Sequence, residues 1–302
     1  MNKKYSLILS IFIFLCAFPL YAQDADGSAA APAPAPSADQ AALAKAAANP
    51  IANMISLPFQ FNFNFDQGPY ERYGTVMNFE PVLPFRLSKT WNVVTRTIIP
   101  VLQKPNILSE DGSTSGIGNT NFNAFFVPKP IGIFTYGFGL TMNIPTATAP
   151  QLGGDAFGMG PTIVFLFMPG KWVLGATAGW TMSYKSPDGT DALNSLFAQY
   201  FITVNLKKGW FLNTTPTITA NFNAPEGEEW TVPVGAGFGK IQHFKKVPVK
   251  FNLQYYYNAV QASATPGTEY IDLAHDPRQP MGAASQSLVF QMTFMFPHKA
   301  KK

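Results

Sequence analysis

Two charged residues, Glu80 and Arg96, lie at matching positions in neighbouring segments of the chain. A turn centred on Ser88 would join these segments and place the two side chains directly across a pair of antiparallel strands. Both residues fall on the polar face of their segment, so we predict a cross-strand ion pair. Such a pair could form a constriction in a pore or a purely structural latch, and we favour the latch.

Uncharged amides share this polar face in other segments. In 59–65 every second residue is phenylalanine, with amides between, and in 247–261 aromatic and aliphatic residues alternate with amides. Such period-two alternation indicates a β-strand with one apolar and one polar face. The amides that we expect on the polar face, facing a lumen, are Asn62, Asn64, Asn252, Gln254 and Asn258.

The same alternation recurs along the chain and predicts about 12 strands. Their expected ranges are 58–65, 73–86, 90–102, 117–128, 132–144, 157–168, 171–184, 194–206, 210–222, 229–241, 247–261 and 284–297. Short connections alternate with longer ones, which are 66–72, 103–116, 145–156, 185–193, 223–228 and 262–283. Bacterial outer-membrane barrels combine short periplasmic turns with longer extracellular loops in this way. A soluble β-sandwich has no reason to sort its loops.

The composition agrees with a barrel in a membrane. Only 13% of the residues are charged and 14% are aromatic, whereas a soluble domain has about 25% charged residues. After the N-terminal region there is no run of about 18 apolar residues, so spanning helices are excluded. We therefore predict an all-β protein, a transmembrane antiparallel β-barrel of about 12 strands. A soluble β-protein is the alternative fold.

Three tryptophans, Trp91, Trp172 and Trp210, each follow directly after a short turn. Aromatic residues form girdles where such barrels cross the membrane interfaces. We predict that these three belong to the interfacial girdle, and the alternative is three core tryptophans at strand starts.

The N-terminal region divides into two parts. Residues 1–22 combine early lysines with an apolar stretch of about 14 residues and predict a removed Sec signal peptide, with an uncleaved anchor as the alternative. Residues 23–50 form an Ala/Pro-rich periplasmic linker, in which 37–49 is expected to contain a short helix. We favour a tether for this linker, and the alternative is a plug that enters the barrel from below. The barrel is expected to occupy 51–302.

Little in the sequence points to catalysis. Cys16 is the only cysteine and lies inside the predicted signal, so the mature chain has no thiol nucleophile, disulfide or thiolate metal site. No Ser or Asp is evidently placed beside the histidines, which are His243, His275 and His298. We therefore expect no enzyme and no catalytic residues.

Metal, cofactor and nucleic-acid sites are not expected either. The last long loop holds Glu269, Asp272, His275 and Asp276, whose spacing matches no metal-binding motif. The glycine clusters precede no helix, so a dinucleotide site is not predicted. The formal net charge of +4 is too small to indicate a nucleic-acid partner.

Several segments resemble a known family, and they are Asn49–Asn53, Leu57–Gln60, Trp91–Pro100, Ile144–Thr148, Gly158–Pro161, Trp230–Lys240 and Phe294–Pro297. The family comprises Gram-negative outer-membrane proteins of the meta-pathway phenol-degradation-like group, some of which carry the label neuromedin U. The resemblance spans 49–297. It implies an outer-membrane barrel with a transport role and supplies no catalytic residues.

These observations predict a monomeric channel or transporter in the outer membrane of a Gram-negative bacterium, with both termini in the periplasm. We expect passive passage of small, neutral or aromatic solutes, where the aromatic class rests on the resemblance. The alternatives are a closed structural or surface-interaction barrel without transport and an outer-membrane enzyme. The expected partners are outer-membrane lipid, the solute and the barrel-assembly machinery. Outer-membrane barrels usually end on an aromatic residue that this machinery reads, whereas here Pro297–Lys302 follow Phe296 of the last predicted strand.

Overall fold

The computed structural model describes residues 38–107, 109–183, 193–224, 226–245, 247–261 and 284–297. Within this part of the chain one α-helix, α2 (Ala38–Ala48), precedes the sheet. The strands are β1 (Met54–Gln67), β2 (Arg72–Phe79), β3 (Val82–Arg86), β4 (Trp91–Pro105), β5 (Ser113–Ile117), β6 (Thr120–Pro128), β7 (Phe134–Ile144), β8 (Gly158–Phe167), β9 (Trp172–Met182), β10 (Asn194–Asn205), β11 (Trp210–Thr214), β12 (Thr217–Asn221), β13 (Trp230–Phe244), β14 (Val247–Val260) and β15 (Gln286–Pro297). Two short 3-10 helices, η1 (Pro150–Leu152) and η2 (Lys207–Gly209), lie in connections.

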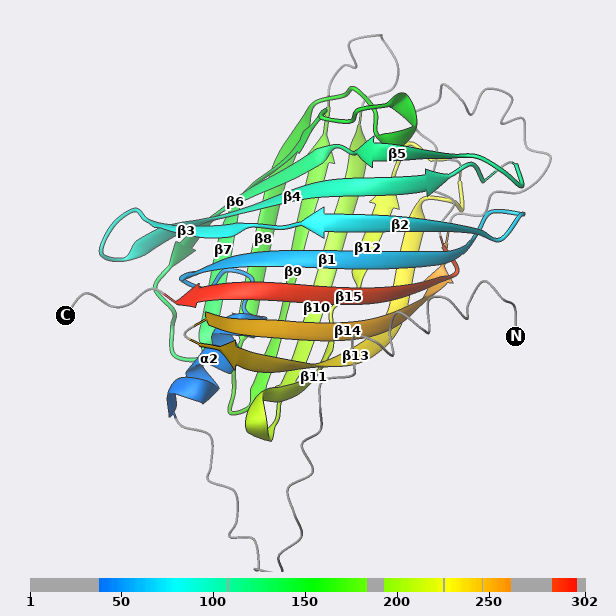
Figure 1. The fold of residues 1–302 in the computed structure, drawn as a ribbon. Coiled ribbons are helices and arrows are strands. Elements are labelled where there is room, and N and C mark those ends of the chain that lie inside the picture. Colours follow the sequence, from blue (N-terminus) through cyan, green and yellow to red (C-terminus); the bar gives the residue numbers. More distant parts are fainter. Residues whose placement is uncertain are drawn as a thin grey trace, which may run out of the picture. The chain divides into compact units, whose positions relative to one another are not determined.

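The strands pair antiparallel in chain order, and the last strand closes the ring. β15 pairs with β1 from Met54↔Pro297 to Phe65↔Gln286. Three barrel strands are each interrupted once: β2 and β3 both pair with β1 and β4, β5 and β6 both pair with β4, and β11 and β12 both pair with β10 and β13. The sheet is therefore a closed antiparallel barrel of 12 strands (Figure 1). The predicted fold class is confirmed.

Prolines mark two of the three interruptions. Pro81 separates β2 from β3, and Pro216 separates β11 from β12. Proline has no N–H to donate to a neighbouring strand, so the ladder breaks where it occurs. Beside the first break, the backbone N–H of Glu80 still donates to Pro58 O at 2.9 Å. This interruption lies next to the predicted ion pair.

Side chains alternate between the two faces of the barrel wall, as the sequence predicted. In β8, Ile163 and Phe165 expose 51% and 47% of their surface, whereas Val164 between them is fully buried. In β7, Phe138 is 49% exposed on the outer face and Thr141 is buried on the inner face. The outer surface is thus apolar, and the inner surface carries the polar side chains.

Several strand ends differ from the sequence prediction by a few residues, and two of them lie at short turns or beside the closure of the ring. β1 begins at Met54 rather than at Pro58, because Met54–Leu57 also pair with β15. β13 continues to Phe244, beyond the predicted end at Ile241, because Phe244 pairs with Val247 across a tight turn. Lys245 in this turn adopts a left-handed φ of 56°, which suits a short hairpin.

Among the described residues, none of the helices has the length and the apolar character needed to cross a membrane.

Candidate functional site

The interior of the barrel holds two adjoining cavities. The larger, which we call the outer cavity, has a volume of about 570 Å³ and reaches Glu228 and Glu229 in the long connection between β12 and β13. The smaller, which we call the inner cavity, has a volume of about 130 Å³ and is bounded by Ala46–Pro50. Arg96 and Gln199 line both cavities, so they lie at the boundary between them.

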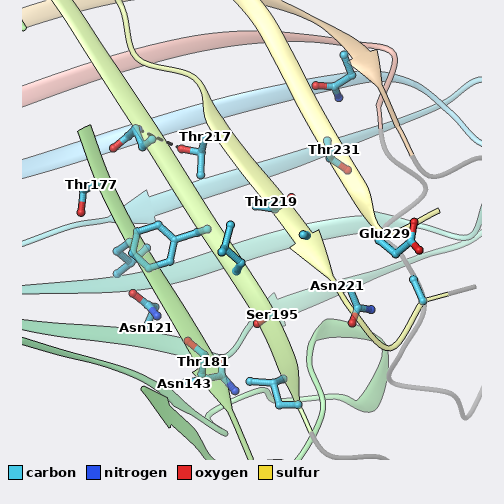
Figure 2. Close-up of a pocket in the computed structure, with 18 of the residues that line it drawn as sticks. Asn121, Asn143, Thr177, Thr181, Ser195, Thr217, Thr219, Asn221, Glu229 and Thr231 are labelled. Carbon is cyan, nitrogen blue, oxygen red and sulfur yellow. Dashed lines mark hydrogen bonds between the residues drawn. The ribbon is translucent and has the colours of Figure 1, made fainter. Parts of the chain in front are cut away.

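Most of the residues that line the outer cavity carry uncharged amides or hydroxyls, and apolar side chains such as Ile98, Leu196 and Phe197 lie among them. Figure 2 shows these groups converging from several strands. The labelled residues are Asn121, Asn143, Thr177, Thr181, Ser195, Thr217, Thr219, Asn221, Glu229 and Thr231. Some are held by the wall itself: Gln199 Nε2 donates to Thr217 Oγ1 at 3.0 Å, and Thr177 Oγ1 donates to Ile163 O at 2.9 Å. The cavity can therefore offer many neutral hydrogen-bonding groups to a solute.

Glu80 and Arg96 form an ion pair at the boundary of the cavities. Arg96 Nη2 lies 2.8 Å from Glu80 Oε2, and the side chains expose 21% and 5% of their surface respectively. Both residues line the inner cavity. The pair is thus buried on the Glu80 side and open to the lumen on the Arg96 side.

The predicted register of this pair is wrong by one diagonal step. Arg96 pairs directly with Val82, and Glu80 lies in the interruption before β3. The hairpin is therefore not centred on Ser88. The ion pair survives because diagonal neighbours across two strands remain within reach of a long side chain such as arginine.

The predicted lumen amides fall into two groups. Asn64 and Asn258 line the outer cavity, and Asn252 lines the inner one. Asn62 and Gln254 line neither cavity. Asn62 Nδ2 donates to Val76 O at 3.2 Å, while Gln254 Oε1 accepts hydrogen bonds from three side chains, those of Asn213, Thr215 and Tyr256. These two amides tie the wall together rather than facing open space.

The lumen is not polar throughout, contrary to the sequence-based expectation. Near the short turns the inward side chains form an apolar belt, which comprises Val82, Val94, Phe125, Val127, Val164, Leu166, Val173 and Phe201. Ile51, only 3% exposed, packs against this belt together with Ala48. The belt thus forms an apolar seat for the segment that precedes β1.

Helix α2 packs at the same end of the barrel, against strands on the side of the lumen opposite the apolar belt. Leu43, Ala44, Ala46 and Ala47 contact a second apolar group, formed by Ala52, Met54, Phe211, Ile241 and Met295. In Figure 1, α2 is the blue helix at the end where the short turns lie. Residues 38–53 thus fill the mouth of the barrel at this end, and we call them the N-terminal segment.

Two lysines fasten the N-terminal segment to the wall. Lys45 Nζ donates to Met168 O at 3.1 Å. Lys250 Nζ, from β14, donates to Ala47 O at 3.2 Å. A cation at the C-terminal end of a helix also interacts favourably with the carbonyls there. Small alanine side chains and few polar contacts otherwise hold the segment.

Glycines in β9 leave room for aromatic side chains of β10 to lie along the wall. Gly179 pairs with Phe197, and Gly175 pairs with Phe201. A Cβ atom on either glycine would overlap the facing phenylalanine ring. The two rings therefore lie in the space that a side chain at Gly175 or Gly179 would occupy. The lumen is wider than it would be if the rings pointed into it.

Gly179→Val is expected to reduce the single-channel current of a chain that lacks residues 23–50, because the valine displaces the ring of Phe197 into the outer cavity. The matched control is Ala178→Val, which adds methyl groups on the outer face of the same strand and should leave the current unchanged. An unaltered current in Gly179→Val, with the barrel folded, would show that Phe197 does not set the width of the lumen.

The tryptophans occupy the outer surface near the two ends of the barrel. Trp172 and Trp210 at the short-turn end expose 40% and 44% of their surface, and Trp91 is partly buried. Trp180 and Trp230 lie at the other end, where each packs against the same phenylalanine, Phe222. The membrane girdle predicted for the first three stays a prediction.

The other residues singled out in the sequence add no second site. His243 lies exposed in β13. Among the described residues no cluster of His, Cys, Asp and Glu could hold a metal ion. His298 and the loop with Glu269, Asp272, His275 and Asp276 lie outside the described residues.

Sequence reasoning missed several lumen residues that the same rule would have found. Lys250 shares its strand face with Asn252, so strict alternation places it inside. Gln199 and Phe197 likewise alternate with outward residues of β10. The seat for the N-terminal segment could not have been found in this way, because it depends on side chains from ten barrel strands that meet only in the closed ring.

Comparisons with known proteins support the fold and nothing finer. No protein-family model matches the sequence, and no curated protein matches it. Among solved structures the chain is similar to an outer-membrane channel of Pseudomonas putida F1, at 12% identity and a TM-score of 0.58, over 80% of this chain and 95% of that one. It is also similar to the porin NanC, at 9% identity and a TM-score of 0.48 over 81% and 100%. The third is the outer-membrane phospholipase of Salmonella typhi, at 11% identity and a TM-score of 0.43 over 80% and 90%.

Proposed function

We propose that this protein is an outer-membrane channel of a Gram-negative bacterium that lets small solutes pass by diffusion. The observation that carries the proposal is a closed barrel, apolar outside, which encloses a cavity of about 570 Å³ with amides and hydroxyls among its lining residues. A barrel of 8 strands is just filled by side chains, and one of 16–18 strands leaves an open channel. A 12-stranded barrel with a partly open lumen fits between these cases.

The apolar outer surface of the barrel supports a location in a lipid bilayer. Large apolar side chains on the outward face of several strands are more than one-third exposed, and examples are Phe138, Ile163, Phe165, Leu212, Val234 and Phe238. A soluble monomer rarely exposes so continuous an apolar surface, whereas a membrane barrel presents such a band to lipid. We propose that lipid covers this surface and that the short turns and both termini face the periplasm.

The N-terminal segment suggests that the channel is closed at its periplasmic end in this state. A solute that enters from the long loops reaches the outer cavity and then Arg96, below which residues 38–53 fill the mouth. We propose that residues 1–22 are the removed signal peptide and that the N-terminal segment acts as a plug rather than only as the end of a tether. The plug also makes a closed structural barrel the second candidate function.

The solute class suggested by the sequence is neutral or aromatic. The uncharged wall of the outer cavity supports the neutral class. The aromatic class and the phenol-degradation relationship rest on the sequence resemblance and stay hypotheses. We propose no enzymatic activity, and we expect assembly into the membrane by the barrel-assembly machinery.

Cell fractionation tests the proposed location. The protein should be recovered with outer membranes, should need detergent for extraction, and should migrate differently on a gel before and after heating. Recovery in a detergent-free periplasmic extract would refute a membrane barrel.

Swelling of proteoliposomes tests transport. Vesicles that contain the variant without residues 23–50 should swell in an isosmotic solution of a small neutral sugar, and empty vesicles provide the baseline. Baseline swelling with a heat-modifiable, folded barrel would favour the structural role.

A further inference from the structure

We infer that the outer cavity is a binding site for a neutral, polyhydroxylated solute of the size of a mono- or disaccharide. The inference rests on the proposed channel function, because the site would then be a station along the path of the solute. Its volume of about 570 Å³ lies within the range of about 300–1,000 Å³ that is usual for small-molecule sites.

The hydrogen-bonding groups of the wall match such a solute. The amides and hydroxyls come from several strands: Thr177 and Thr181 of β9 and Thr217 and Thr219 of β12 lie on the two strands that flank β10, and Asn121 of β6 lies three strands beyond β9 (Figure 2). Amides and hydroxyls both donate and accept hydrogen bonds, as sugar hydroxyls do. Apolar side chains such as Ile98, Leu196 and Phe197 also line the cavity. An apolar solute would contact them but would leave the neighbouring amides and hydroxyls without the hydrogen bonds of the water that it displaces.

Thr219 shows this capacity most clearly. It lies in β12 and lines the outer cavity, to which its side chain is exposed. Within the part of the chain that the structure describes, no hydrogen bond engages its hydroxyl. Its hydroxyl is therefore available to a solute, whereas that of Thr177 is already used in holding two strands together.

An aromatic face completes the site. Phe197 lines the outer cavity beside these polar groups, with the tip of its ring over Gly179 in the wall. Small-molecule sites commonly combine an aromatic surface with a few polar groups that fix orientation. The ring can contact the C–H face of a sugar while the amides and hydroxyls bind its edge.

The charges around the cavity disfavour anions. At the boundary with the inner cavity, Glu80 forms an ion pair with Arg96 at an N–O distance of 2.8 Å and neutralises its charge. Glu228 and Glu229 lie at the end of the cavity nearest the long loops. An anion would meet these carboxylates first, and Arg96, the one Lys or Arg among the described residues that line this cavity, is already paired with Glu80. Lys250 lies beyond it in the inner cavity, where it donates to Ala47 O. A neutral sugar avoids both penalties.

Saturation-transfer NMR on the full-length protein purified from outer membranes in detergent tests the site without requiring transport. Glucose is the probe, glucuronate is its anionic counterpart, and toluene is the apolar comparator. We expect saturable glucose binding and weaker glucuronate binding. Toluene that binds more tightly than glucose and competes with it for the cavity would overturn the inference.

Thr219→Val removes one hydroxyl from the cavity without changing the size of the side chain. It should weaken glucose binding about three- to tenfold, as expected for the loss of one hydrogen bond. Ile218→Val, on the outer face of the same strand, is the matched control and should leave binding unchanged. Equal glucose affinity in both variants would place the bound sugar elsewhere and contradict the inference.

The site and the channel can fail separately. Glucose binding that depends on Thr219, with no glucose-driven swelling of vesicles containing the variant without residues 23–50, would retain the site and refute the channel. Swelling at the same rate in glucose and glucuronate, with no Thr219-dependent binding, would retain the channel and refute the site.

Discussion

Arg96→Met is expected to lower the free energy of unfolding of the barrel by about 3 kcal/mol, because it leaves the carboxylate of Glu80 buried without its cation. The Glu80 side chain is only 5% exposed, and it lies 2.8 Å from Arg96 Nη2. Removal of one partner from a buried pair costs about 3–5 kcal/mol. The lower end applies here because Arg96 borders the lumen, from which water can reach the vacated space.

The loss can be measured as a lower midpoint of thermal unfolding, followed by circular dichroism in detergent. The double variant Glu80→Gln/Arg96→Met removes both charges and should recover most of the lost stability. A structural latch predicts an unchanged current in the chain without residues 23–50. An unchanged midpoint would contradict the latch, and altered ion selectivity with normal stability would make the pair a constriction.

Ile51→Asp is expected to release the N-terminal segment and to raise the single-channel conductance severalfold. Ile51 is 3% exposed and packs against the apolar belt of the lumen. An ionised carboxylate in that position would be buried without a partner, which costs several kcal/mol. Few other contacts hold the N-terminal segment in the barrel. Release of the segment from the mouth therefore exposes the carboxylate to water at a lower cost than unfolding of the barrel would.

Planar-bilayer recordings of the full-length variant check this expectation. Ile51→Val keeps the apolar contact and is the matched control, so its conductance should equal that of the wild type. A folded Ile51→Asp barrel with wild-type conductance would mean that Ile51 does not hold a plug in place.

The fold was predictable because a barrel strand carries its own signature. Alternation such as that in Phe59–Phe65 reports which side chains face outward, whichever strands lie beside it. Successive antiparallel strands also pair with their chain neighbours, so the order of the elements is the order in the ring. The interruptions beside Pro81 and Pro216 do not disturb this order, because both halves of each strand keep the same neighbours.

The ion pair was predictable in its partners but not in its register. Glu80 and Arg96 are the charges placed on the polar faces of adjoining strands, and that fact is visible in the sequence. The register depends on the geometry of the turn near Ser88 and on the break at Pro81. Neither is fixed by the spacing of the charges alone.

The sequence leaves the role of the N-terminal segment open for a physical reason. Its alanines carry almost no pattern that distinguishes a tether from a plug. Its seat consists of apolar residues such as Val94, Leu166 and Phe201, which are far apart in the sequence and are brought together by closure of the barrel. Lys250, which donates to Ala47 O, likewise becomes a helix cap only in three dimensions.

Conductance across a planar bilayer, with residues 23–302 compared against residues 51–302, tests the central claim most directly. The account predicts brief or small channel steps for the longer chain and larger, discrete steps for the shorter one, because removal of α2 opens the mouth at the short turns. Silence from both, with folding confirmed by heat modifiability, would contradict an open channel and leave a structural barrel. Equal steps from both would show that the N-terminal segment does not close the lumen.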